Sequence, residues 1–257
     1  MKNTFSTVIS SLLLTSFLFS VSFAQSGVNY FFEQGNQSYR KGNYNEAIEH
    51  YQKILDAGYE SGRVYYNLGN CYYKLDKIGY AILYYEKSRK FLPNDPEIDF
   101  NLELARLKVI DRLEMPPRFF LFEWWDSLKY YYSVSQLTYL SIIAYFLTAM
   151  VFILYLFLKK DRIRGLLFSI FLIFLVATLL SGYFLFANVY ENKTNQYGIL
   201  LSPNVSVLSA PDQNGTEVFI LHEGVKVKVA DQRENWLKIM LPDGKSGWVK
   251  KENIGVI

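Results

Sequence analysis

Apolar and polar positions follow three different patterns along the chain. From residue 28 to residue 95 apolar residues recur at helical spacing, and the same pattern occurs twice in succession. Residues 137–158 and 166–187 contain no charged side chain. After residue 192 apolar and polar residues alternate, as they do in half-buried strands. The chain is therefore predicted to be multidomain, with all-α helical repeats, an α-helical transmembrane hairpin and a small all-β barrel.

The helical pattern predicts two copies of one helix pair, at residues 28–61 and 62–95. The four helices are expected at 29–41, 44–57, 62–75 and 78–91. Gly35 and Gly69 stand at equivalent positions, where a missing side chain lets the paired helix approach closely. A further helix, 96–113, is expected to cap the stack, because a terminal repeat must hide its apolar face. The whole repeat domain is placed at residues 25–115.

These repeats resemble tetratricopeptide (TPR) repeats, because the step from Gly35 to Gly69 equals the family's period. The second copy carries Tyr65, Leu68, Gly69, Tyr72, Ala81, Tyr85 and Pro93 at the family's consensus positions, with Ser88 in place of the usual alanine. The first copy matches at Phe31, Gly35, Ala47 and Tyr51. The resemblance implies a domain that binds other proteins.

The resemblance also implies a concave groove lined by the first helix of each repeat. The candidate partner-binding residues are Asn36, Tyr39, Arg40, Tyr66, Asn70, Tyr73 and Lys74, with Asn29, Phe32 and Arg63 beside them. Asparagine amides would bond the backbone of an extended peptide, aromatic rings would bury its side chains, and Arg40 and Lys74 would meet carboxylates. The alternative is that each residue belongs to an ordinary solvated helix face.

The N-terminus has the layout of a secretory signal peptide, residues 1–24. Lys2 precedes an apolar core, and Ala24 ends a small-residue cleavage site. An uncleaved anchor is the alternative. Export would place the repeat domain outside the cytoplasm.

The two uncharged stretches predict transmembrane helices at 137–158 and 166–187, since about 20 residues cross a hydrocarbon core. Between them, residues 159–165 contain four basic residues, which favours a cytoplasmic loop. Both soluble domains would then face the periplasmic or outer side of the cytoplasmic (inner) membrane. Neither span contains an acidic or basic residue, which argues against a transporter or channel.

Residues 116–136 form an aromatic linker before the first span. Trp124, Trp125 and the run Tyr130-Tyr131-Tyr132 are typical of a membrane interface. A partner-binding aromatic patch is the alternative interpretation.

Residues 193–257 show short alternating strands separated by Gly and Asn/Asp turns, which indicates a small barrel. The motifs Trp236-Leu237-Lys238-Ile239 and Gly247-Trp248-Val249 resemble bacterial SH3-like domains, which bind peptides or cell-wall components. Tyr197, Trp236 and Trp248 are the candidate partner-binding aromatics. For each tryptophan the alternative is a place in the barrel core.

The remaining composition adds no catalytic chemistry. The net charge of +3 gathers beside the apolar stretches and not on a folded face, so nucleic acid is not an expected partner. The single cysteine, Cys71, excludes an intramolecular disulfide and is expected to be buried. No nucleophile triad, phosphate loop or zinc spacing is present in the sequence. We expect no enzyme activity, no cofactor and no metal site.

The whole architecture resembles the BatE-type proteins, the TPR components encoded in bacterial aerotolerance (Bat) operons. The resemblance implies a place in an envelope stress complex, with von Willebrand A-domain membrane proteins and a MoxR-type ATPase encoded nearby. The leading hypothesis is therefore a membrane-anchored scaffold that binds protein partners or extended peptides. The alternative is a sensor that binds peptidoglycan through its SH3-like domain; a hydrolase or transporter subunit is a third.

Overall fold

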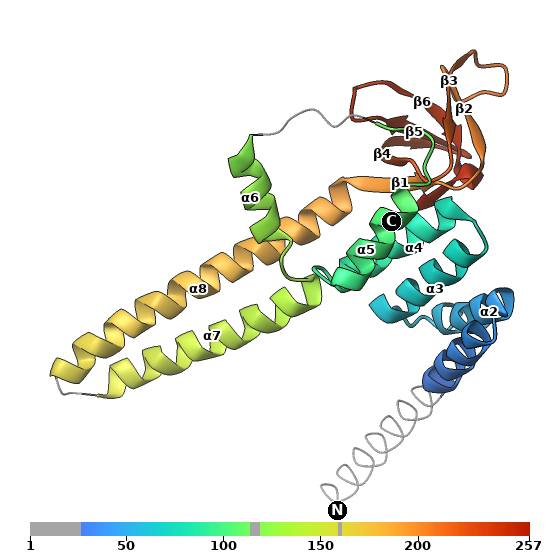
Figure 1. Cartoon of the computed structure of the whole chain (residues 1–257). Coiled ribbons are helices and arrows are strands. Elements are labelled where there is room, and N and C mark those ends of the chain that lie inside the picture. The colour runs from blue at the N-terminus through green and yellow to red at the C-terminus, as the bar shows by residue number, and fades with distance from the viewer. Residues whose placement is uncertain (1–26, 114–118, 159–160) are drawn as a thin grey trace, which may run out of the picture.

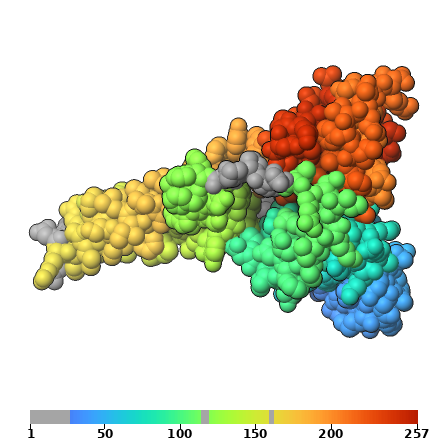
Figure 2. All heavy atoms as spheres, turned by 45° about the horizontal axis from the view of Figure 1, so that its top comes forward, coloured from blue at the N-terminus to red at the C-terminus, as the bar shows by residue number. Residues whose placement is uncertain are grey.

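The computed structural model describes residues 27–113, 119–158 and 161–257 (Figure 1). Two predictions, the signal peptide and Lys159-Lys160 of the basic loop, therefore lie outside the described residues. The chain forms helical repeats in its N-terminal part, a hairpin of two long apolar helices and a C-terminal antiparallel sheet, so the predicted fold class is confirmed. Figure 2 shows the hairpin projecting from a body made of the repeats and the sheet.

Two helix pairs form the repeat domain. The described helices are 27–40, α2 (Tyr44–Asp56), α3 (Gly62–Lys74) and α4 (Ile78–Phe91). The small residues have the expected role, because a Cβ at Gly35 would lie 2.5 Å from a ring carbon of Tyr51. A Cβ at Gly69 would lie 2.6 Å from Tyr85. Cys71 of α3 is fully buried in the apolar cluster where α2 and α3 pack, as expected for a small apolar residue.

Ser88 replaces the alanine of the TPR consensus and has a structural role here. Its side chain is fully buried, and its hydroxyl donates a 2.7 Å hydrogen bond to the carbonyl of Gly62. A buried hydroxyl is tolerated when it is hydrogen-bonded, and here the bond ties the end of α4 to the start of α3.

The capping helix is shorter than predicted. α5 spans Pro96–Arg106, with the Asp95 carboxylate accepting from the Glu97 amide, and it does not continue to residue 113. The chain leaves the helix because Val109 and Leu113 pack against the core of the sheet domain instead. Asp111 then accepts the amide hydrogen of His222 at 2.6 Å. Residues 107–113 thus join the two soluble domains.

The hairpin consists of α7 (Val134–Phe157) and α8 (Asp161–Thr194). Both are long and apolar enough to cross a membrane; α7 begins before its predicted span, and α8 extends beyond its predicted span at both ends. α7 begins early because Ser133 and Gln136 form a capping box. The helices meet at small and polar residues, where the hydroxyls of Thr148 and Thr178 lie 2.9 Å apart.

The linker between the repeats and the hairpin contains a helix that the sequence did not predict. α6 spans Phe120–Lys129 and packs against α8, with the rings of Trp125 and Phe184 5.6 Å apart. The ammonium of Lys129 lies 2.6 Å from the carboxylate of Glu191. This helix exposes most of its aromatic side chains.

The C-terminal domain is a seven-stranded antiparallel sheet in the order β3-β2-β6-β5-β4-β1-β7. The strands are β1 (Gln196–Leu200), β2 (Asn204–Leu208), β3 (Glu217–His222), β4 (Lys226–Arg233), β5 (Trp236–Met240), β6 (Ser246–Lys250) and β7 (Ile254–Val256). Its core is formed by alternate residues such as Val205, Val227 and Ile239. The sheet therefore encloses a small apolar core in the way the alternating pattern predicts.

The sheet domain docks on α4, which the sequence did not predict. Ile199 of β1 is fully buried in one cluster with Ile82 and Leu83 of α4. The backbone amide of Gly79 donates to the Glu223 carboxylate at 2.8 Å. A Cβ on Gly79 would lie 2.5 Å from the carbonyl oxygen of Leu200, so only glycine permits this approach. The repeats and the sheet thus form one packed body.

Candidate functional site

The concave side of the repeats carries a network of asparagine and tyrosine side chains. In the first repeat the Tyr51 hydroxyl donates to Oδ1 of Asn36 at 2.8 Å, and Nδ2 of Asn67 donates to the same oxygen at 3.0 Å. An asparagine amide has two donors on its nitrogen. Within the part of the chain that the structure describes, no acceptor binds Nδ2 of Asn36. The network therefore fixes the amide while leaving its donors for a ligand.

The second repeat contains the same arrangement at its equivalent positions. The Tyr85 hydroxyl donates to Oδ1 of Asn70 at 2.7 Å, and Asn101 of α5 donates to that oxygen at 3.2 Å. Asn101 also donates to the Tyr66 hydroxyl at 2.8 Å. The network therefore links helix 27–40, α3 and α5, which are the first helices of successive repeats.

Burial keeps the tyrosine donors protonated. Desolvation is the largest cause that raises the pKa of Tyr51 and of Tyr85 above the usual value. Both hydroxyls thus remain donors at every physiological pH, and the two asparagine oxygens remain occupied. The orientation of Asn36 and Asn70 is fixed before any ligand arrives.

The network lines a small cavity of about 100 Å³ formed by Asn36, Tyr39, Arg40, Tyr51, Asn67 and Asn70. Four of the predicted groove residues, Asn36, Tyr39, Arg40 and Asn70, are thus brought together. Tyr51 and Asn67 were not predicted to take part. Their signal in the sequence was the repeat offset that relates them to Tyr85 and Asn101.

The other three predicted groove residues lie further along the same face. The ring of Tyr66 packs 6.0 Å from that of Tyr85. The ring of Tyr73 lies 4.7 Å beneath the ammonium of Lys108, and Lys74 is exposed. Tyr73 is therefore partly covered by the chain's own lysine, whereas Lys74 is open to solvent.

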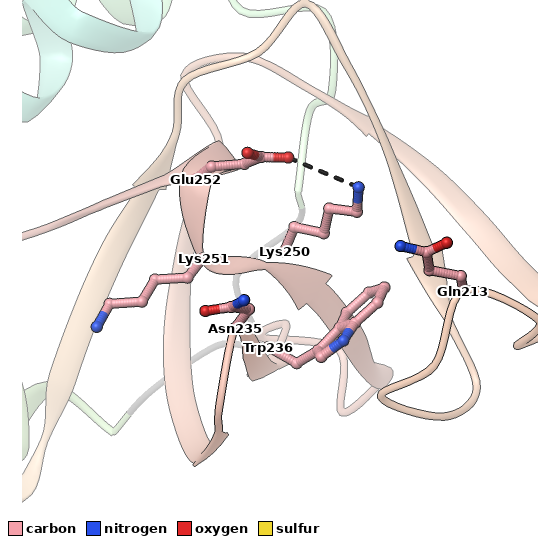
Figure 3. Close-up of a pocket in the computed structure, with 6 residues that line it drawn as sticks. All are labelled: Gln213, Asn235, Trp236, Lys250, Lys251 and Glu252. Atoms are coloured by element: carbon pink, nitrogen blue, oxygen red, sulfur yellow. Dashed lines mark ion pairs between the residues drawn. The ribbon is translucent and has the colours of Figure 1, made fainter.

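The sheet domain has a separate pocket of about 450 Å³ (Figure 3). Gln213, Asn235, Trp236, Lys250, Lys251 and Glu252 line it. The half-buried indole of Trp236 lies between Lys250 and the loop that carries Gln213, and Lys250 pairs with Glu252 at 3.7 Å. One aromatic wall with amides and both charge signs suits a ligand that is itself polar and amide-rich.

The three predicted aromatics of this domain do not share that pocket. Trp248 is only 6% exposed and lies beneath the guanidinium of Arg233 at 5.3 Å, so it is a packing residue. Tyr197 sits on β1 with the ammonium of Lys226 5.3 Å above its ring, near the repeat domain. Trp236 is the single predicted aromatic that lines the pocket.

A buried carboxylate between the domains escaped the sequence analysis. Glu86 is 4% exposed and contacts Arg89 at 2.9 Å, Arg106 at 2.8 Å and Lys226 at 3.0 Å. Burial alone would raise the pKa of Glu86, but the three cations outweigh it and hold the pKa below its usual value. Nothing in the local sequence indicated that Glu86 would be buried, because Lys226 comes from the other domain.

No group of three or more His, Cys, Asp or Glu side chains is arranged to hold a metal ion within residues 27–113, 119–158 and 161–257. His50 and His222 lie apart, and His222 is held by Asp111 at 3.1 Å. The two surfaces described above offer hydrogen-bonding groups, aromatic rings and charged side chains.

Comparison with known proteins supports both domain types. The family model "Bacterial SH3 domain" matches residues 203–255, and the model "Tetratricopeptide repeat" matches residues 62–95. No curated protein matches the chain. Among solved structures, an NlpC/P60 family protein from Bacillus cereus ATCC 10987 is 10% identical over 28% of this chain and 23% of that chain, with a TM-score of 0.21.

The likeness spans under a quarter of that structure's length. The chain contains a TPR motif and a bacterial SH3 domain together with two apolar helices that are long enough to span a membrane. TPR and bacterial SH3 domains bind proteins or cell-wall material.

Proposed function

We propose that this protein is a membrane-anchored envelope scaffold, without catalytic activity, that binds an extended segment of a partner protein in the repeat groove. The observation that carries the proposal is the fixed amide of Asn36. Its oxygen is occupied by Tyr51 and Asn67, so its donors are aligned for the carbonyl groups of an extended backbone. A donor fixed in advance loses little entropy on binding.

The hairpin supplies the anchor in this proposal. α7 and α8 expose apolar side chains along their length, and the repeats and the sheet lie together at the end of the hairpin away from the α7–α8 connection (Figure 1). Both domains would then face one compartment. Four basic residues at 159–164 and the signal-like N-terminus favour the outer side of the cytoplasmic membrane.

Partners in the same membrane follow from this placement. We propose that the scaffold acts in a Bat-type aerotolerance or stress complex, with von Willebrand A-domain membrane proteins as the bound class. The support is the order of the segments along the chain, which resembles BatE-type proteins.

Site-specific photocrosslinking in the native membrane tests the scaffold. A photoreactive residue at position 39 is expected to give a discrete protein adduct, identified by mass spectrometry. The Asn36→Ala and Asn70→Ala variants should lose that adduct, whereas Asn45→Ala, on the exposed side of α2, should retain it. Adducts that are unaffected by Asn36→Ala and Asn70→Ala would refute binding in the groove.

A second candidate function is binding of cell-wall peptidoglycan by the sheet domain. The Trp236 pocket favours it, because an indole wall beside Asn235 and Gln213 suits sugar rings and acetamido groups. Detergent-solubilised full-length protein should sediment with purified peptidoglycan. Trp236→Ala should abolish sedimentation, whereas Ile220→Ala, an exposed apolar change on β3, should not. Failure of the unmodified protein to sediment removes this candidate.

A further inference from the structure

α5 has the position of the first helix of a third repeat. The hydrogen bond from Asn101 to Asn70 repeats the one from Asn67 to Asn36, one repeat further along the chain. The same offset takes Tyr66 to Phe100. α5 therefore adds a third wall to the groove as well as closing the stack.

The polar and apolar residues of α5 lie on different sides of the helix, as this position in a third repeat predicts. Asp99, Glu103 and Arg106 stand where a helix of a complete third repeat would pack, and Arg106 pairs with Glu86 and Glu103. The groove positions carry Phe100, Leu104 and Leu107 instead. Phe100 is 64% exposed and Leu107 is 74% exposed. α5 is thus polar on the side where a further repeat helix would pack and apolar on the side that lines the groove. Exposing such apolar side chains to water is unfavourable.

A row of cations crosses the same groove. Arg40, Lys74 and Lys108 occupy equivalent repeat positions, in helix 27–40, in α3 and in the turn just after α5. Lys108 is neutralised by Asp76 at 2.7 Å. Among the described residues, no carboxylate pairs with Arg40 or Lys74. The groove therefore carries the exposed side chains of Phe100 and Leu107 at its α5 end, with the carboxylate of Glu97 near Tyr66, and the cations of Lys74 and Arg40 lie further along it.

The apolar end lies next to the start of the hairpin. The side-chain amide of Asn94, just before α5, donates to the carbonyl of Tyr131 at 2.8 Å. Tyr131 lies just before α7, and Figure 1 shows α5 as the repeat helix beside the beginning of α7. A chain that emerges from the bilayer beside α7 would meet Phe100 and Leu107 first.

We propose that the occupant is the extended juxtamembrane segment of a membrane-spanning partner protein, apolar next to the membrane and acidic beyond it. The inference rests on the proposed function and specifies its ligand. Packed helices lie about 8–10 Å apart and an extended chain advances about 3.3 Å per residue, so each helix of the groove takes about three residues. The apolar side chains contact Phe100 and Leu107, and carboxylates follow about three and six residues later at Lys74 and Arg40.

A display experiment tests the sequence of the segment. A phage library of random dodecapeptides is selected on the full-length protein in lipid nanodiscs, and enriched peptides are measured by fluorescence anisotropy. The expected consensus is an apolar pair followed by acidic residues at those spacings. Phe100→Ser or Leu107→Ser should weaken binding about tenfold or more, whereas the exposed control Val218→Ser should not. Arg40→Glu should weaken binding and its neighbour Lys41→Glu should not.

A tethering experiment tests the membrane origin. The selected peptide is fused to a single transmembrane helix through its apolar end, or through its acidic end, in the same nanodisc. Attachment at the apolar end should raise the apparent affinity about a hundredfold through effective concentration, and attachment at the acidic end should not. Equal enhancement from both ends would overturn the assigned direction.

The outcomes separate the two proposals. Binding that needs Asn36 and Asn70 but tolerates Phe100→Ser and Leu107→Ser overturns the juxtamembrane segment and leaves the groove function standing. A selection in which no peptide is enriched, or in which enriched peptides bind the Asn36→Ala and Asn70→Ala variants undiminished, overturns both.

Discussion

The carboxylate of Glu86 and the ammonium of Lys226 lie 3.0 Å apart and join α4 of the repeats to β4 of the sheet. The two residues are far apart in sequence, and each belongs to a different domain type. Glu86 also holds Arg89 and Arg106, so one buried carboxylate organises cations from three elements. This contact is one of those that hold the repeats and the sheet together as one packed unit.

Replacing Glu86 with Gln should destabilise that unit. The substitution leaves three cations around a neutral side chain, and loss of one partner of a buried ion pair costs about 3–5 kcal/mol. The partly exposed cations recover some hydration, so we expect the lower end of this range. Denaturant unfolding of the detergent-solubilised protein measures the change. Glu103→Gln, which removes an exposed partner of Arg106, should cost less than about 1 kcal/mol.

The stabilisation by Glu86 should disappear in acid. Its pKa is lowered in the folded protein, so the stabilisation is complete above the unfolded value of about 4.3 and is lost as the pH falls through the folded value. The unfolding free energy of the natural protein minus that of Glu86→Gln should be constant near neutral pH and shrink below about pH 4. A difference that grows on acidification would contradict the arrangement of charges.

Gly79→Ala should separate the two domains. The new Cβ would lie 2.5 Å from the carbonyl oxygen of Leu200. Alanine favours a helix by about 0.5–1 kcal/mol, but the enforced backbone shift costs typically about 1–3 kcal/mol. Limited proteolysis should therefore cut residues 107–113 faster in the variant. Gly182→Ala in α8 is the control, because a Cβ there meets nothing within 4 Å.

Tyr85→Phe should loosen the groove without unfolding it. Removing the hydroxyl deletes a 2.7 Å hydrogen bond to Asn70 and costs about 1 kcal/mol. The ring remains in its place against Gly69, so the melting temperature should fall by only a few degrees. The free energy of binding a groove peptide should decrease by more than the free energy of unfolding does, because the Asn70 amide is then free to rotate. Equal peptide affinity in both proteins would show that Tyr85 has no part in orienting Asn70.

The local features of this fold were predictable, whereas its contacts between domains were not. Gly35 and Gly69 indicated close helix packing because the repeat period constrains both. The alternation in residues 196–256 indicated the sheet because one face must be buried. Glu86 looked like an ordinary surface acid, since nothing local reveals that Lys226 will cover it. The predicted length of α5 was too great, because apolar residues such as Val109 and Leu113 are equally compatible with a continuing helix and with a contact to the barrel.

The candidate site was predicted in part for the same reason. Asn36 and Asn70 followed from the repeat positions, and the structure places both on one face with Tyr39 and Arg40. For Trp248 the sequence left open a binding position or a core position, because tryptophan serves equally in both, and its burial agrees with the core alternative. Phe100 and Leu107 were overlooked because α5 was regarded as a cap only.

The short junction between α8 and β1 fixes the distance between the hairpin and the sheet domain. α8 ends at Thr194 and β1 begins at Gln196, so Asn195 alone separates them, and its amide still bonds the carbonyl of Glu191. A helix of 34 residues is about 50 Å long, and a hydrocarbon core is about 30 Å thick. The part of α8 that exceeds this thickness is helical and therefore stiff. It continues into a sheet that is itself fixed to α4. With the hairpin in a membrane, as proposed, the groove would be held at a fixed distance and orientation relative to the bilayer, and it would meet only those ligands that reach this distance.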